Sequence, residues 1–305
     1  QQDFEGLDVR PPEVWRYFVR VQPDVLARFA DAHDLTDLAP RAVEDEFVYQ
    51  NSFRLNQRFY ASLTCPGRKC QGGGRQGQRA FVLSHGRDLL VFKLVGYAEQ
   101  AAQYYRLDDL TAHVWIAHQR YPTKGRVWHP GGAHPFVGLN EALVHNGDFA
   151  NYHAVTEYLR QRNIAPLFLT DTEVSVQLFD LYDRIYGYPL EVTLEALAPT
   201  TERDFAVLPP EKRSLYRAVQ AAHIHTSPDG PWFFIIARSR PEEGECQLLG
   251  ITDTSMLRPH VFALSEKNPS DAVQLGLVAS ERQAIQAALR SLADEDTRFM
   301  PHADK

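Results

Sequence analysis

The residue types with the clearest chemical potential lie in the segment 113–173. Asn146 and Gly147 follow a short apolar run in ALVHNGDF. An Asn side-chain NH2 and a Gly backbone N–H can act as two donors that converge on a developing oxyanion, and Gly permits the close approach. The same dipeptide is a common tight-turn signal, so a simple turn stays open as the alternative.

Other side chains in this segment could hold an amino acid by its two ends. Arg120 offers a planar fork that binds a carboxylate through two bonds, and Thr123 could add a contact to the same group. Asp171 could pair with an ammonium group. Each has a simpler interpretation: a surface ion pair for Arg120, a turn residue for Thr123 and a favourable helix-dipole position for Asp171.

Histidines and cysteines raise the question of a metal site. No histidine pair has the i, i+4 helical spacing of a zinc site, and no Cys pair lies near the histidines. Cys65 and Cys70 lack a second pair and favour a free loop, while Cys246 lies in a strand pattern and is expected in the core. We therefore assign no metal, although five of the twelve histidines fall close together: His113, His118, His129, His134 and His145.

Helices and strands must position these residues. The Gly- and Gln-rich segment 65–78 is predicted to be a flexible loop. Thr170 and Glu173 have the spacing of a capping box at the start of a helix over 170–186. Apolar spacing predicts further helices after Pro23 and over 44–62, 151–162, 211–222 and 280–292. Strands are predicted as a hairpin over 80–94 and at 112–117, 142–145, 231–238, 246–252, 260–265 and 275–280, which gives an α+β class.

Composition narrows the function classes. The net charge is -7 over 305 residues, which gives no support for a nucleic-acid footprint. No apolar stretch approaches the roughly 20 residues of a membrane-spanning helix, and Gln1 does not open a signal peptide. Three Cys suit a reducing cytoplasm and not a disulfide-built secreted domain. We expect one cytoplasmic domain over 1–305, with no nucleic-acid or membrane partner.

Four segments together resemble a known family. HVWIAHQRYPTKG, GGAHPF, ALVHNGDFANY and LFLTDTEVSVQLFDL occur in the order and at spacings similar to those of the class II, or N-terminal nucleophile, glutamine amidotransferase domain. GYAEQAAQYYRLDDL and YPTKGRVWHPGGAHPF look most like the amidotransferase subunit of archaeal-type glutamate synthases. The resemblance covers roughly 44–292.

The resemblance implies a role for each side chain that would bind substrate. Arg120 matches the Arg that binds the α-carboxylate of L-glutamine, with Thr123 beside it. Asp171 matches the acid that binds the α-amino group. His134, in GGAHPF, matches a His that lines the glutamine pocket.

The resemblance also implies the catalytic centre and the fold. Asn146 and Gly147 match the oxyanion hole, and the fold is a four-layer αββα sandwich of the N-terminal nucleophile hydrolase type. The family's nucleophile is an N-terminal Cys whose α-amine serves as base, whereas position 1 here is Gln. Cys65 precedes a Pro in a Gly-rich loop and is no substitute. We expect the Cys and the first strand upstream of Gln1, and no glutaminase activity from the chain alone.

Two functions from different classes follow. In the first, the intact protein is a glutaminase that converts glutamine to glutamate and channels ammonia to a synthase partner, with FMN and an iron–sulfur cluster on that partner and no cofactor in this domain. This predicts a hetero-oligomer that takes part in glutamate biosynthesis. In the second, the chain is a catalytically silent amino-acid-binding or scaffolding module. Retention of Arg120, Asn146, Gly147 and Asp171 favours the first, because a scaffold needs no oxyanion hole.

Overall fold

The computed structural model describes residues 14–63, 81–119, 130–168, 170–253, 260–265 and 274–297. The chain divides into two compact units, Gln1–Gln50 and Asn51–Lys305. In the first unit, α1 (Pro23–Ala32) and the first turns of α2 (Pro40–Leu63) share a small core of Phe29, Ala30 and Val43. One functional domain over 1–305 stays a prediction.

The second unit is built on an antiparallel sheet with the order β1-β2-β3-β4. Its central strands β2 and β3 pair from Glu141 opposite Arg238 to Gly147 opposite Trp232. A second antiparallel pair, β5 with β6, is followed by α9, which packs on β6. The strands are β1 (Phe136–Val137), β2 (Glu141–Gly147), β3 (Trp232–Arg240), β4 (Glu245–Thr252), β5 (His260–Ser265) and β6 (Gln274–Ala279).

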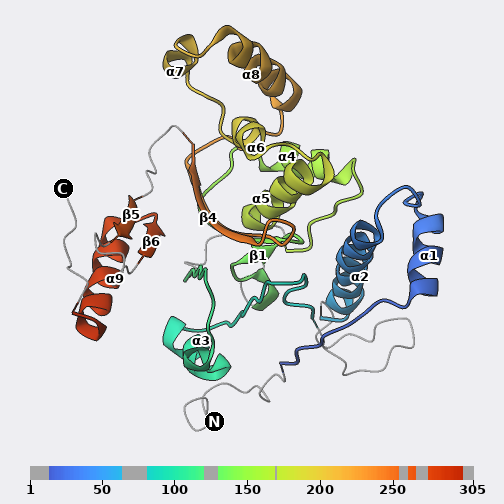
Figure 1. Ribbon diagram of the computed structural model, residues 1–305, viewed down its shortest axis with the longest axis horizontal. Coiled ribbons are helices and arrows are strands. Elements are labelled where there is room, and N and C mark those ends of the chain that lie inside the picture. The colour runs from blue at the N-terminus through green and yellow to red at the C-terminus, as the bar shows by residue number, and fades with distance from the viewer. Residues whose placement is uncertain are drawn as a thin grey trace. The chain divides into compact units, whose positions relative to one another are not determined.

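In the second unit, α3 precedes β1, α4 to α8 all lie between β2 and β3, and α9 follows β6; Figure 1 labels these helices. The long α8 and α9 correspond to predicted helices, whereas α3, α6 and α7 were not predicted. The α-helices are α3 (Ala98–Tyr105), α4 (Tyr152–Arg160), α5 (Asp171–Asp180), α6 (Leu190–Leu197), α7 (Glu202–Ala206), α8 (Pro210–His223) and α9 (Arg282–Glu295). Short 3-10 turns η2 (Leu107–Asp109) and η3 (Pro130–Gly132) and a π turn η4 (Leu181–Ile185) complete the set.

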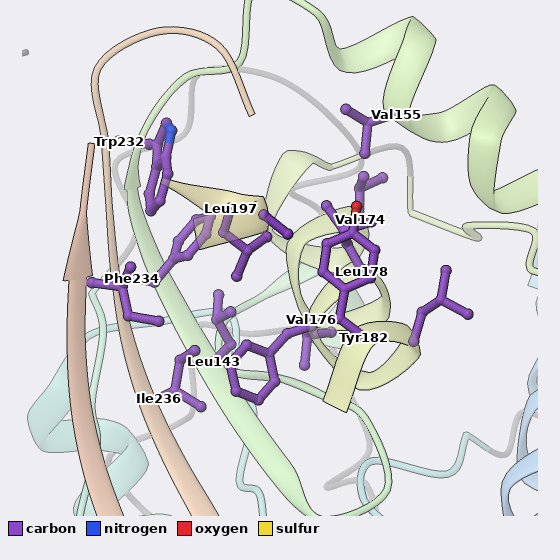
Figure 2. Close-up of a cluster of buried hydrophobic side chains, with 14 of the residues drawn as sticks. Leu143, Val155, Val174, Val176, Leu178, Tyr182, Leu197, Trp232, Phe234 and Ile236 are labelled. Carbon is purple, nitrogen blue, oxygen red and sulfur yellow. The ribbon is translucent and has the colours of Figure 1, made fainter. Parts of the chain in front are cut away.

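The main core lies where α5 packs on β2 and β3. Leu143 from β2 and Phe234 from β3 meet Val174 and Leu178 from α5, and all four side chains are buried (Figure 2). The helix itself is buried on every side, from Thr172 to Asp180. This packing fixes the first turn of α5 relative to the end of β2.

The other face of this sheet meets the second sheet. Side chains alternate along a strand, so Phe233 points away from the face that holds Phe234. On that side, Cγ2 of Val278 in β6 lies 3.1 Å from the place a Cβ on Gly250 would take. The structure is thus α+β with antiparallel sheets, and the αββα nucleophile-hydrolase fold stays a prediction.

The strands predicted over 80–94 and 112–117 are wrong, because the described residues there form none. In the first segment, side chains satisfy backbone groups that a strand ladder would use. Asn56 bonds both the N–H and the C=O of Val82, and Ser84 Oγ accepts from Val91 N. In the second, Trp115 is half exposed and no described strand pairs with it.

The predicted start of α5 at Thr170 is confirmed although its capping box forms only in part, and the predicted start of α9 needs correction. Thr170 caps α5 by accepting from Glu173 N at 3.2 Å, but the Glu173 carboxylate does not bond back to Thr170. It accepts instead from Leu167 N and Phe168 N, both at 2.7 Å, so only half of the capping box forms. At α9 the N-cap is Glu281, and its side chain makes no capping bond.

Candidate active site

Asn146 and Gly147 are the last two residues of β2. They pair with Phe233 and Trp232 of β3, so the dipeptide continues the strand and does not form a tight turn. Gly147 has a φ of +134°, and a Cβ there would lie 2.1 Å from the Pro231 carbonyl oxygen. Only glycine suits this position, because any side chain would meet backbone atoms.

The Asn146 side chain is exposed and already has one partner. Its Nδ2 donates to Ser280 Oγ, directly after β6, at 3.1 Å. A primary amide carries two hydrogens, so this bond uses one of them. Ser280 therefore orients the amide without exhausting its capacity as a donor.

Asp171 stands at the first position of α5, facing the end of β2. Its Oδ1 accepts from Thr172 N at 2.9 Å and lies 3.4 Å from Nδ1 of His145. The His145 side chain is only 2% exposed, whereas that of Asp171 is 24% exposed. The helix N-terminus favours the carboxylate form, and the exposed fraction leaves it within reach of a ligand.

His134 is hydrogen-bonded to Thr172, the residue that follows Asp171 in the first turn of α5. Its Nε2 is hydrogen-bonded to Thr172 Oγ1 at 2.8 Å, and both residues are buried. The ring of His118 lies against it, with ring centroids 4.1 Å apart. Groups from three segments thus lie at the first turn of α5: β2, the turn before β1, and the residues around His118.

The structure therefore brings four predicted site residues to one region, with His145 joining the end of β2 to Asp171 and Thr172 joining α5 to His134. Arg120 and Thr123 lie outside the described residues, as do Cys65, Cys70 and the segment 65–78. Sequence reasoning assigned no role to His145, Thr172 or Ser280. For His145 the signal was a histidine inside an apolar strand run, where an imidazole needs a polar partner.

A second group of buried charges lies at the opposite end of β2. Glu141 is fully buried, and its pKa is raised well above the usual value by burial first and by Asp180 next. Arg184 binds both oxygens of Asp180, with Nη2–Oδ2 at 2.6 Å and Nε–Oδ1 at 2.8 Å. Burial also lowers the pKa of His85 from 6.5 to about 4. Six residue-to-residue steps of extended strand, roughly 20 Å, separate Glu141 from Gly147.

The structure tests the prediction for Cys246, whereas the absence of a metal site stays a prediction. Within the described residues, no three His, Cys, Asp or Glu side chains gather as metal ligands. Cys246 lies in β4 as its pattern indicates but is exposed, so its assignment to the core is wrong. Its place near the start of an edge strand leaves the thiol open to solvent. Among the described helices, none combines the length and apolar character needed to cross a membrane.

Known proteins resemble this chain over different spans. An uncharacterized protein from Archaeoglobus fulgidus is 32% identical over 283 residues, 92% of this chain and 63% of that protein. A glutamine–fructose-6-phosphate aminotransferase (isomerizing) from Campylobacter jejuni is 31% identical over 180 residues, 55% of this chain and 28% of the enzyme. Its namesake from Bacteroides thetaiotaomicron is 34% identical over 101 residues, 32% of this chain and 16% of that enzyme.

These similarities indicate an amidotransferase-like or sugar-isomerase-like region in about a third of the chain. The chain spans less than two thirds of the length of each of these relatives. No family model matches it. The named relatives support the amidotransferase class that the motifs predict, but they do not support its finer assignment to glutamate synthase.

Proposed function

We propose that this chain supplies the glutamine-binding and oxyanion-stabilising groups of a class II glutamine amidotransferase. The observation that carries the proposal is the meeting of β2 and α5, where Asn146 and Gly147 lie near Asp171 through the buried His145. Similarity to aminotransferases that use glutamine, by their names, supports the class. The nucleophile-hydrolase fold and the carboxylate-binding roles of Arg120 and Thr123 belong to the proposal and rest on motif resemblance.

The chemistry is the hydrolysis of the glutamine side-chain amide. A cysteine thiolate attacks Cδ, the C–N bond breaks, and ammonia leaves with the proton it receives from the α-amine base. Water then cleaves the thioester to give glutamate and restore the thiol. Gly147 N–H and the Asn146 amide would stabilise the oxyanion, while Asp171 would hold the substrate ammonium. The proposal needs a cysteine nucleophile with a free α-amine, as the family resemblance implies.

The finer proposal concerns where the ammonia goes. The motifs 96–110 and 121–136 favour a glutamate synthase, in which ammonia passes to 2-oxoglutarate on a partner carrying FMN and an iron–sulfur cluster. The named relatives favour a different acceptor, fructose 6-phosphate. In both cases the acceptor site lies on another domain or subunit, and we propose a cytoplasmic hetero-oligomer for the synthase.

Glutaminase assays on the full-length protein test the proposal that it hydrolyses glutamine. Asp171→Asn should raise KM for glutamine by about ten-fold or more, because one charge-assisted contact to the ammonium is lost. Asp204→Asn is the matched control, since Asp204 also lies in the first turn of a helix, α7. Binding of glutamine without hydrolysis would indicate the silent amino-acid-binding module instead.

A second assay separates the two acceptors. The full-length protein with its partners is given glutamine and either 2-oxoglutarate with a reductant or fructose 6-phosphate, and the aminated product is identified. New glutamate beyond that released by hydrolysis supports the synthase. Formation of an amino sugar phosphate contradicts the synthase and leaves the amidotransferase proposal intact.

A further inference from the structure

Lys93 is a buried lysine inside the apolar run LLVFKL. Lys93 is only 5% exposed. A lysine is almost never buried this deeply unless a partner satisfies its ammonium group. Its Nζ donates to the carbonyl oxygen of Gly131 at 2.9 Å and lies 4.1 Å from the ring centroid of Phe136. A hydrogen bond from Tyr105 OH to the Lys93 carbonyl, 2.6 Å long, fixes the lysine backbone.

The two contacts of Lys93 lie at the two ends of one turn. Gly131 opens the segment GGAHPF and Phe136 closes it, where β1 begins. His134 lies between them and is bonded to Thr172 on α5. One ammonium group therefore holds both ends of the turn that carries the imidazole.

The charge of Lys93 also faces the start of α5. Burial lowers the pKa of Lys93 from 10.5 to about 7, and the negative charge of Glu173 opposes that shift. Glu173 is itself held by Leu167 N and Phe168 N. Lys93 thus links the turn before β1 to the same helix turn that bears Asp171 and Thr172.

We propose that Lys93 is a positioning residue of the candidate glutamine site, where its ammonium fixes the 131–136 turn and so holds His134 against Thr172. This inference rests on the proposed function for its kinetic consequence. It makes no claim that Lys93 touches substrate. Its structural consequence, the order of the turn, holds whatever the site binds.

The main test is Lys93→Met in the full-length protein. Methionine keeps most of the volume but removes the donor and the charge. KM for glutamine should rise about ten-fold, as for the loss of one charged hydrogen bond, while kcat changes less than about three-fold. His134→Asn should raise KM similarly, and the double variant should be no worse than the stronger single variant. Lys212→Met, at a partly exposed lysine on α8, is the matched control.

The pH dependence of KM gives a second test. Among the described residues, Glu173 on α5 is the charge that acts on Lys93. The titratable Tyr105 of α3 bonds the backbone carbonyl of Lys93, and His134 lies in the turn that the Lys93 ammonium contacts. In the wild type, KM should rise as pH passes through about 7, because the neutral amine holds the Phe136 ring and Glu173 less strongly. Lys93→Met should lose this rise, and so should His134→Asn, because Lys93 acts on KM through His134. A rise that persists in Lys93→Met overturns the proposal.

Amide hydrogen exchange separates failure of this inference from failure of the proposed function. In Lys93→Met, exchange at residues 131–136 should be faster than in the wild type, with exchange in α8 unchanged. If the parent has no glutaminase activity but this local change occurs, the function is wrong and the role of Lys93 in the turn stands. Unchanged exchange in the turn, or additive effects of Lys93→Met and His134→Asn on KM, would overturn the role of Lys93.

Discussion

Asn146 combines a predicted chemical role with a bond to a distant residue, Ser280. Asn146→Ala in the full-length protein should lower kcat by about 10²–10³, as for the loss of one oxyanion donor. Ser280→Ala removes only the group that orients the amide, so it should lower kcat by about five-fold, as for one neutral hydrogen bond. Steady-state kinetics with glutamine would check both. An Asn146→Ala protein with raised KM and normal kcat would contradict the oxyanion role.

Gly147 offers a residue-scale test of stability. Gly147→Ala should lower the free energy of unfolding by more than about 2 kcal/mol, since the backbone lies at φ +134° and the new Cβ meets the Pro231 carbonyl. Gly244→Ala is the matched control, with φ +67° and no atom within 4 Å of the new Cβ. It should cost about 1 kcal/mol. Equal losses in urea unfolding would show that the contact with Pro231 relaxes easily.

The first turn of α5 is the element on which the site depends. Thr170→Ala should lower the free energy of unfolding by about 1 kcal/mol, because the Glu173 N–H loses its capping oxygen. KM for glutamine should rise as well, since the same turn places Asp171. Thr201→Ala is the comparison: Thr201 caps the short helix α7 with a longer bond of 3.4 Å, so its loss should cost less and leave KM unchanged. Thermal unfolding and kinetics of both variants provide the measurement.

Elements with a strong local signal could be predicted from the sequence. Apolar runs predict β3 to β6, and the spacing around Thr170 predicts the start of α5. Within the site, the residue types in the HNG and TDTE motifs indicated Asn146, Gly147 and Asp171. The structure brings these residues to the meeting of β2 and α5, and their chemical roles stay predictions.

Other features depend on distant partners and could not be predicted. Asn56 lies far from Val82 in sequence, yet its side chain takes the backbone groups that the predicted hairpin would have used. The link between His134 and Thr172 likewise spans the turn before β1 and α5. A lysine inside an apolar run indicates that Lys93 has a buried partner. The sequence alone does not show that this partner is the 131–136 turn.

For the molecule as a whole, buried titratable groups set how stability depends on pH. Folding lowers the pKa of Lys93 from 10.5 to about 7, so between these values the unfolded chain holds the extra proton and the free energy of unfolding rises with pH. His85 acts in the same direction between about 4 and 6.5. Glu141 acts oppositely, because its raised folded pKa makes stability fall as pH rises above 4.5.

Urea unfolding at pH 7 and pH 9 would isolate the lysine. We expect the difference in unfolding free energy, pH 9 minus pH 7, to be lower in Lys93→Met than in the wild type by about 2 kcal/mol. Lys212→Met should keep the wild-type difference, because that side chain is partly exposed on α8. An identical difference in the wild type and Lys93→Met would mean that Lys93 keeps its proton at pH 9.

The bond between Asn146 and Ser280 also bears on biosynthesis. The two residues are 134 positions apart, so a ribosome that has just completed β2 has made the amide but not the hydroxyl that orients it. The nascent chain can form this bond only after Ser280 has emerged, because the hydroxyl partner is made 134 residues after the amide. Under the proposed function, this side of the site would form late in translation, after most of the second unit has been made.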